Sequence, residues 1–220
     1  MAIRVVISDF GGVLTTPLIG SFMAFQDQTG ITGESLGKAM QRIYERDGEH
    51  PLYELEKGHI TEADFLTTLR AELTIELGHE PEMHGFKEIY FEALNPNEPM
   101  IETMRAAKGA GKRMALLTNN VREWEPLWRT MLPVDEIFEL VVDSAFVGMR
   151  KPEPEIYRLT LERIRAHDPD ELGDLEFSEC LFVDDVEVNC TAAHELGINI
   201  VHFRENDQAI AEMRAALDAA

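Results

Sequence analysis

Along most of this chain, short apolar runs alternate with stretches in which apolar residues recur at helical spacing. The predicted strands are the short apolar runs at 3–9, 113–118, 140–143, 180–184 and 198–202. The predicted helices have apolar residues at helical spacing and cover 100–110, 123–131, 155–165, 189–196 and 207–217. Strands that alternate with helices are typical of a parallel sheet with crossover helices. The pattern therefore predicts an α/β fold.

The stretch between the first and second strands has a different pattern. Apolar residues at 36, 39, 40, 43 and 44 recur at helical spacing, and so do those from Phe65 to Leu77. Thr61-Glu62-Ala63-Asp64 before the second series is typical of a capping box. We therefore predict a helical domain at 16–95, inserted into an α/β core domain formed by 1–15 and 96–220.

Composition and charge narrow the possible partners. The chain has 220 residues, of which 45% are hydrophobic, and its net charge is −21. Such a charge repels nucleic acid and anionic membranes. The apolar runs are too short for a membrane span or a secretory signal. We expect a cytoplasmic protein that acts on a small molecule, as a monomer or homodimer, with Cys180 and Cys190 reduced.

Polar residues collect where the predicted strands end. Asp9 follows the first strand and is itself followed by Gly11 and Gly12. Thr118-Asn119, Lys151 in Gly148–Pro152, and Asp184-Asp185 are predicted at three further strand ends. Because ligands of open α/β sheets bind at the carboxyl ends of the strands, these residues are predicted to form one site.

Each of these signals alone has a structural alternative. Asp9 suits a nucleophile or a metal ligand, but equally a turn cap. Thr118 could bind phosphate at a helix start or cap that helix, and Lys151 could neutralise phosphate or lie on the surface. Paired carboxylates at a buried strand end need a cation, so Asp184-Asp185 favours Mg²⁺.

The order of the four motifs resembles the haloacid dehalogenase superfamily, in its phosphatase-like branch. The matching motifs are Asp9-Phe10-Gly11-Gly12-Val13, Thr118-Asn119, Lys151-Pro152 and Asp184-Asp185, with Asn189 downstream. The segment Gly148–Tyr157 is most similar to the amino-terminal phosphatase domain of soluble epoxide hydrolases. The resemblance implies a Rossmann-like parallel sheet flanked by helices, with a small helical cap.

The resemblance also implies a Mg²⁺-dependent phosphatase acting on a small phosphorylated metabolite. Asp9 would attack phosphorus and form an aspartyl-phosphate, assisted by Thr118 and Lys151. The implied phosphate-binding residues are Gly11, Gly12, Thr118, Asn119 and Lys151. Asp9, the Gly11 carbonyl and Asp184 would bind Mg²⁺. Asp185 and Asn189 would not bind the metal themselves but would orient the groups that do.

One position departs from the family pattern. Most phosphatases of the family have an acid–base aspartate where this chain has Gly11, and acid–base help is worth about 10²–10⁴-fold in rate. Two alternatives therefore stay open: a non-catalytic module that binds a phosphorylated ligand or a protein, and a metal-independent 2-haloacid dehalogenase. Candidate specificity residues, which could equally serve packing or the surface, are His50, Tyr53, His59, Arg122 and Trp124.

Overall fold

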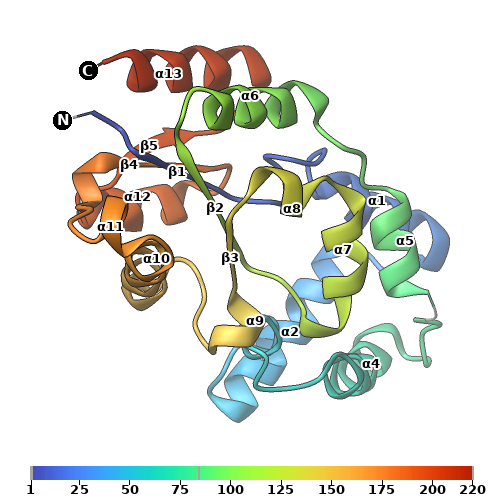
Figure 1. The fold of residues 1–220 in the computed structure, drawn as a ribbon. Helices are drawn as coiled ribbons and strands as arrows, with labels where there is room; N and C mark the ends of the chain where they lie inside the picture. Colours follow the sequence, from blue (N-terminus) through green and yellow to red (C-terminus); the bar gives the residue numbers. More distant parts are fainter. Residues whose placement is uncertain (1, 84, 220) are drawn as a thin grey trace.

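A parallel five-stranded sheet forms the centre of the computed structural model, which describes residues 2–83 and 85–219. The strand order is β3-β2-β1-β4-β5 (Figure 1). The strands are β1 (Val5–Ser8), β2 (Arg113–Thr118), β3 (Leu140–Asp143), β4 (Cys180–Asp184) and β5 (Asn199–His202). The predicted α/β class with a parallel sheet is confirmed.

Helices cover both faces of the sheet, so alternate strand residues face two cores. Val6 and Leu116 face one core with α6 (Glu98–Gly109) and α13 (Asn206–Asp218). Val5 and Leu117 face the other core with α10 (Pro154–His167) and α12 (Glu187–Glu195). The shorter helices of the core are η1 (Arg122–Trp124), α7 (Glu125–Met131), α8 (Val134–Ile137), α9 (Ser144–Val147), α11 (Pro169–Leu172) and η2 (Phe177–Glu179).

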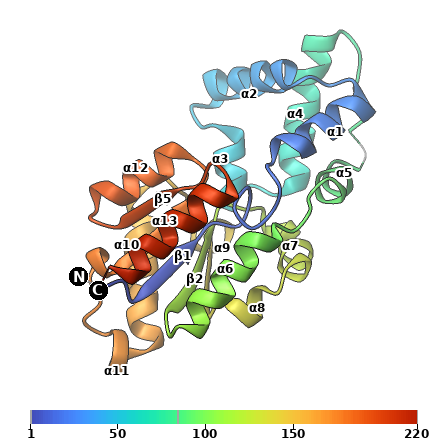
Figure 2. The same cartoon turned by 90° about the horizontal axis from the view of Figure 1, so that it is seen from above.

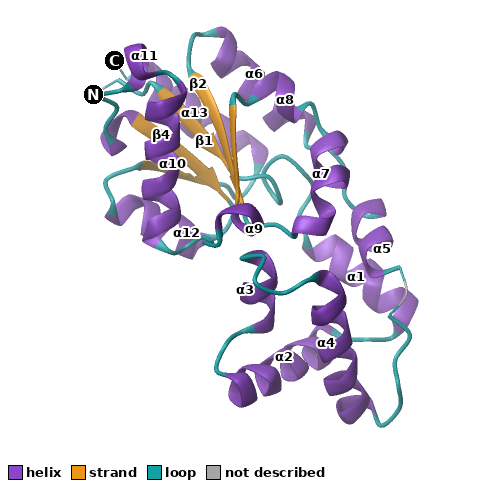
Figure 3. Ribbon diagram, turned by 60° about the horizontal axis from the view of Figure 1, so that its bottom comes forward, coloured by secondary structure: helices purple, strands orange, loops and turns teal. Residues whose placement is uncertain are grey.

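A helical segment lies between β1 and α6. It contains α1 (Ile19–Thr29), α2 (Gly33–Asp47), α3 (Pro51–Glu56), α4 (Glu62–Leu77) and α5 (Phe86–Glu92). Helices α2 and α4 pack on each other away from the sheet, whereas α3 lies beside α9 at the carboxyl ends of the strands (Figures 2 and 3). We call this segment the helical insertion; its division from the core at 16–95 stays a prediction.

The two chain segments that lead into and out of the helical insertion lie side by side. Thr15 forms an antiparallel bridge with Pro96, and the amide of Thr16 donates to the Asn95 carbonyl at 2.8 Å. The chain therefore leaves the core for the insertion and returns to it at the same place. No helix of the described chain is long and apolar enough to cross a bilayer.

Most predicted boundaries agree with the structure to within three residues. The strands at 113–118, 140–143 and 180–184 match β2, β3 and β4, while β1 is shorter than predicted. Half of the predicted capping box forms: Thr61 accepts from the amide of Asp64 at 3.1 Å, but the Asp64 carboxylate binds the Thr61 hydroxyl. The single-turn helices α8, α9 and α11 were not predicted, because four residues are too few to show a period.

We predict that the helical insertion depends on the packing between α2 and α4. Leu73 is fully buried there, whereas Ile75 on the same helix is 70% exposed. Leu73→Ala should lower the free energy of unfolding by about 2–5 kcal/mol, because it leaves a cavity. Ile75→Ala should change it by less than about 0.5 kcal/mol. Urea denaturation would measure both, and equal losses would contradict the packing described here.

Candidate active site

Three of the predicted site residues lie side by side at the carboxyl edge of the sheet. Asp9 directly follows β1, and Thr118 and Asp184 are the last residues of the neighbouring strands β2 and β4. Thr118 and Asp184 are 1% and 0% exposed, respectively. The fold therefore brings three of the four motifs together by strand adjacency alone.

Lys151 reaches the same place by a different route, which corrects the prediction that it follows a strand end. Strand β3 ends at Asp143, and α9 then turns the chain before the loop that carries Lys151. Pro154 begins α10, one residue before the predicted start at 155. The loop, and not a strand, thus places Lys151 opposite Asp9 and Asp184.

The Lys151 ammonium lies between two carboxylates. Its Nζ is 2.7 Å from Asp9 Oδ1 and 2.7 Å from Asp184 Oδ2, and the residue is 1% exposed. An ammonium buried this deeply is stable only when it is paired. Asp9 and Asp184 each bind the Lys151 ammonium and together hold it in place.

Burial and charge shift the proton affinities of this group in opposite directions. Burial raises the pKa of Asp9 to about 7; Lys151 opposes this, while Asp184 and Asp185 add to it. Burial lowers the pKa of Lys151, but Asp184 and Asp9 outweigh it and raise the value to about 12. Lys151 is therefore protonated at neutral pH.

Asp184 is oriented by the start of α12. Its Oδ1 accepts from the Val186 amide at 2.8 Å, and Asn189 Nδ2 donates to both carboxylate oxygens at 3.1 and 3.2 Å. The structure thus places Asn189 directly against Asp184.

Gly12 leaves room for the neighbouring carboxylate of Asp185. A Cβ at Gly12 would lie 2.2 Å from Asp185 Oδ2, and the φ of Gly12 is +78°, which side chains rarely adopt. Gly11 lies outside the left-handed region, and a Cβ there would be 3.2 Å from Leu18 Cδ2. Only the second glycine is therefore required by the backbone and by close approach.

The side chain of Asn119 is used to hold the Lys151 loop. Asn119 Oδ1 accepts from the Lys151 amide at 2.8 Å, and Asn119 Nδ2 donates to the Lys151 carbonyl at 2.9 Å. A direct phosphate contact by this side chain would break that pair. The predicted phosphate contact at Asn119 therefore rests on its backbone.

The three carboxylates of the cluster could hold a divalent cation. Ligand atoms of Asp9, Asp184 and Asp185 all lie within 4.8 Å of one another. Carboxylate oxygens suit Mg²⁺. With Lys151 as the partner cation, three ionised carboxylates leave two negative charges in a mostly buried place, which a divalent cation would balance.

The candidate specificity residues gather where the helical insertion meets the core. Tyr53 lies under the Arg150 guanidinium, 3.9 Å from ring centroid to Cζ, and stacks on His50 at 4.3 Å. His59 pairs with Glu54 within the insertion. Arg122 and Trp124 belong to η1, and they bind the Ala145 carbonyl and the Glu62 carboxylate, respectively.

Two residues that the sequence did not indicate approach the site from the helical insertion. Burial, together with the charges of Asp9, Glu56 and Asp185, raises the pKa of Tyr90, so this phenol stays protonated. Burial also raises the pKa of Glu56, although Arg150 opposes the shift. In the sequence both residues lie within predicted helical stretches and belong to no motif, so sequence reasoning could not identify them.

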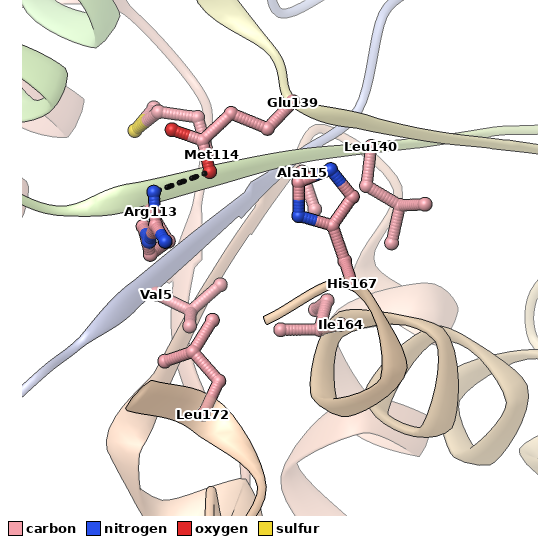
Figure 4. Close-up of a pocket in the computed structure, with 9 residues that line it drawn as sticks. All are labelled: Val5, Arg113, Met114, Ala115, Glu139, Leu140, Ile164, His167 and Leu172. Atoms are coloured by element: carbon pink, nitrogen blue, oxygen red, sulfur yellow. Dashed lines mark ion pairs between the residues drawn. The ribbon is translucent and has the colours of Figure 1, made fainter. Parts of the chain in front are cut away.

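A small cavity lies far from these residues, at the amino-terminal edge of the sheet (Figure 4). Its lining includes the first residues of β1, β2 and β3, which are Val5, Arg113 and Leu140. Its volume of about 10 Å³ gives room for about one water molecule. The cavity is therefore too small for a substrate.

Comparisons with known proteins identify the family. The family model of the haloacid dehalogenase-like hydrolases matches residues 3–197, and the chain belongs to this family. Bifunctional epoxide hydrolase 2 of Rattus norvegicus is 27% identical over 228 residues, which cover 97% of this chain but 38% of that protein. The chain therefore spans well under half of that relative.

Two further comparisons concern a phosphatase and a solved structure. A sesquiterpene phosphatase of Aspergillus oryzae is 29% identical over 128 residues, 55% of this chain and 57% of that protein. The structure of a HAD family enzyme from Bacteroides thetaiotaomicron, in complex with magnesium and inorganic phosphate, is 24% identical with a TM-score of 0.62. The match covers 92% of this chain and 95% of the chain of the solved structure. Its likeness confirms the predicted Rossmann-like fold.

We predict that the Asp9 carboxyl makes stability fall as pH rises when no metal is bound. Between about pH 4 and pH 7 the folded state holds a proton on Asp9 that the unfolded state has lost. The free energy of unfolding therefore falls through this range, by up to about 4 kcal/mol. Asp9→Asn should gain stability relative to wild type as pH rises from 4 to 8 in urea denaturation with EDTA.

A control variant separates this effect from the general charge of the protein. Asp27 is an exposed carboxylate on α1. Asp27→Asn removes one negative charge from the surface and should change the free energy of unfolding by less than about 0.5 kcal/mol. A pH-independent difference for Asp9→Asn would show that Asp9 does not titrate in this range.

Proposed function

We propose that this hydrolase is a Mg²⁺-dependent phosphatase that cleaves a small phosphorylated metabolite through an aspartyl-phosphate on Asp9. One observation carries the proposal: the buried Lys151 ammonium lies 2.7 Å from both Asp9 and Asp184 at the carboxyl edge of the sheet. A fixed cation beside a strand-end carboxylate suits a dianionic phosphate. The phosphatase relative and the magnesium–phosphate complex of the structural neighbour support the same reading.

In the proposed reaction an Asp9 carboxylate oxygen attacks phosphorus, and the bond from phosphorus to the ester oxygen breaks. The ester oxygen leaves with the electron pair of that bond and takes its proton from water, which gives the free alcohol. Water then attacks the phosphoryl group and releases inorganic phosphate and the Asp9 carboxylate. Lys151 offsets negative charge on both groups, and Thr118 with the backbone after β2 holds phosphoryl oxygens. Mg²⁺ held by Asp9, Asp184 and the Gly11 carbonyl would supply further positive charge.

The charge of the cluster separates this proposal from a 2-haloacid dehalogenase. Asp9, Asp184 and Asp185 outnumber the one cation Lys151, so without a metal the site would repel the carboxylate of a haloacid. A phosphate that binds together with Mg²⁺ does not meet this repulsion.

The alternative of a non-catalytic binding module rests on Gly11. A measurement of turnover tests it.

We predict that hydrolysis of p-nitrophenyl phosphate depends on both Mg²⁺ and Asp9. Asp9→Asn should lower kcat by at least about 10³-fold, because the amide is not a nucleophile. Asp143→Asn is a suitable control, since Asp143 is a buried strand-end carboxylate on β3 outside the cluster. Activity that survives in Asp9→Asn would contradict the covalent step, and chloride release without Mg²⁺ would favour the dehalogenase.

We predict that Gly11 makes the rate depend strongly on the leaving group. With no carboxyl at this position, esters with acidic leaving groups should react up to about 10²–10⁴-fold faster than alkyl phosphates. Gly11→Asp should narrow that gap, since the backbone there accepts a side chain once Leu18 shifts slightly. The measurement is kcat/KM over a graded series of esters. A flat wild-type series would show that another group supplies the proton, and Tyr90 would be tested first.

A further inference from the structure

Glu56, the last residue of α3, joins the helical insertion to the core through two separate groups. Its carboxylate accepts from Arg150 Nε at 2.7 Å, and its backbone carbonyl accepts from the Ser144 hydroxyl at 2.6 Å. These partners are 94 and 88 positions away in the chain. Glu56 is therefore held by the core on both its main chain and its side chain.

Both of these partners belong to segments that also hold Lys151. Arg150 directly precedes Lys151 in the same loop. Ser144 accepts from the Asn120 amide at 3.0 Å, and the neighbouring Asn119 holds the Lys151 backbone by two hydrogen bonds. The contacts of Glu56 thus reach the Lys151 loop directly through Arg150 and indirectly through the turn after β2.

The surrounding contacts hold the same turn of the insertion against the core. We call residues 53–58 the docking turn. The Tyr53 ring packs under Arg150, and Lys57 Nζ lies 3.4 Å from Glu153, which accepts from the Arg150 amide. A Cβ at Gly58 would lie 2.3 Å from the Ala145 carbonyl oxygen, so the two backbones approach closely. The docking turn is packed on the Lys151 loop, not merely near it.

The ion pair between Glu56 and Arg150 is shielded, unlike the surface pairs of this chain. The two side chains are 17% and 14% exposed, whereas Arg105 and Glu136 in a surface pair are 36% and 61% exposed. Shielded, charge-assisted hydrogen bonds are stronger than exposed ones, and removing one partner leaves the other charge uncompensated. This pair therefore has the strength to fix the position of the loop.

We propose that Glu56 is a positioning residue that couples docking of the helical insertion to the placement of Lys151. Resting on the phosphatase function proposed above, the inference adds that the site is complete only when the docking turn contacts the core. Glu56 acts through Arg150 and Ser144. It touches neither the phosphate nor the metal.

The test compares Glu56→Gln with Glu76→Gln. Glu76 is a matched control because it lies on α4 of the insertion, its side chain is 22% exposed, and it pairs with Lys38 and Arg42 on α2, outside the docking turn. Glu56→Gln should lower kcat for p-nitrophenyl phosphate roughly 10- to 100-fold with little change in KM. Glu76→Gln should stay within about threefold of wild type.

Hydrogen exchange gives a second readout that does not need turnover. The amides of residues 149–151 and of Glu153 should exchange faster in Glu56→Gln, while those of β1 and β4 keep their wild-type protection. A general loss of stability would instead raise exchange in the strands as well, and that outcome would overturn the inference. Unchanged exchange in 149–153 together with unchanged kcat would overturn it too.

A double variant tests whether Glu56 acts through Arg150. Glu56→Gln and Arg150→Gln combined should lose little more activity than either alone, because both break one interaction. Full additivity would contradict the coupling. Where Glu56→Gln does not fold, Arg150→Lys with the same exchange measurement replaces it. Wild-type protein without any turnover would refute the phosphatase proposal, yet the exchange experiment would still decide the positioning role.

Discussion

The buried ammonium of Lys151 between Asp9 and Asp184 is the interaction on which the rest of the site depends. A lone buried charge costs several kcal/mol, so the Lys151 ammonium is stable there only while carboxylates lie beside it. The fold meets this condition with two supports. Asn189 and the start of α12 orient Asp184, and Asn119 binds the backbone of Lys151 on both sides.

The parallel sheet explains why three carboxylates lie so close together. Strands β1 and β4 are neighbours, Asp9 follows the first of them, and Asp184 and Asp185 lie at the carboxyl end of the second. Asp185 can approach because Gly12 has no side chain. The resulting excess of negative charge is unfavourable in a protein of net charge −21 unless a cation is present. The proposed metal follows from this excess and from the oxygen ligands.

The helical insertion adds what the sheet cannot supply. The core provides Asp9, Lys151 and Asp184 from strand ends and one loop, whereas Glu56 and Tyr90 come from α3 and α5 of the insertion. Burial and the nearby carboxylate charges raise the pKa of the Tyr90 phenol, and Glu56 binds Arg150, the residue before Lys151.

The sequence alone determined the strands, most helices and the residues at the strand ends, because these depend on local apolar periods and on motif order. It correctly placed Asp9, Thr118 and Asp184 at one edge of the sheet. It could not show that Asn119 holds the Lys151 loop, that Lys151 arrives by way of α9, or that Glu56 and Tyr90 matter. Those features depend on contacts between residues tens of positions apart, up to 94 for Glu56 and Arg150. Only the packing of the insertion and the loops onto the sheet decides such contacts, since no local period or spacing encodes which distant side chains meet.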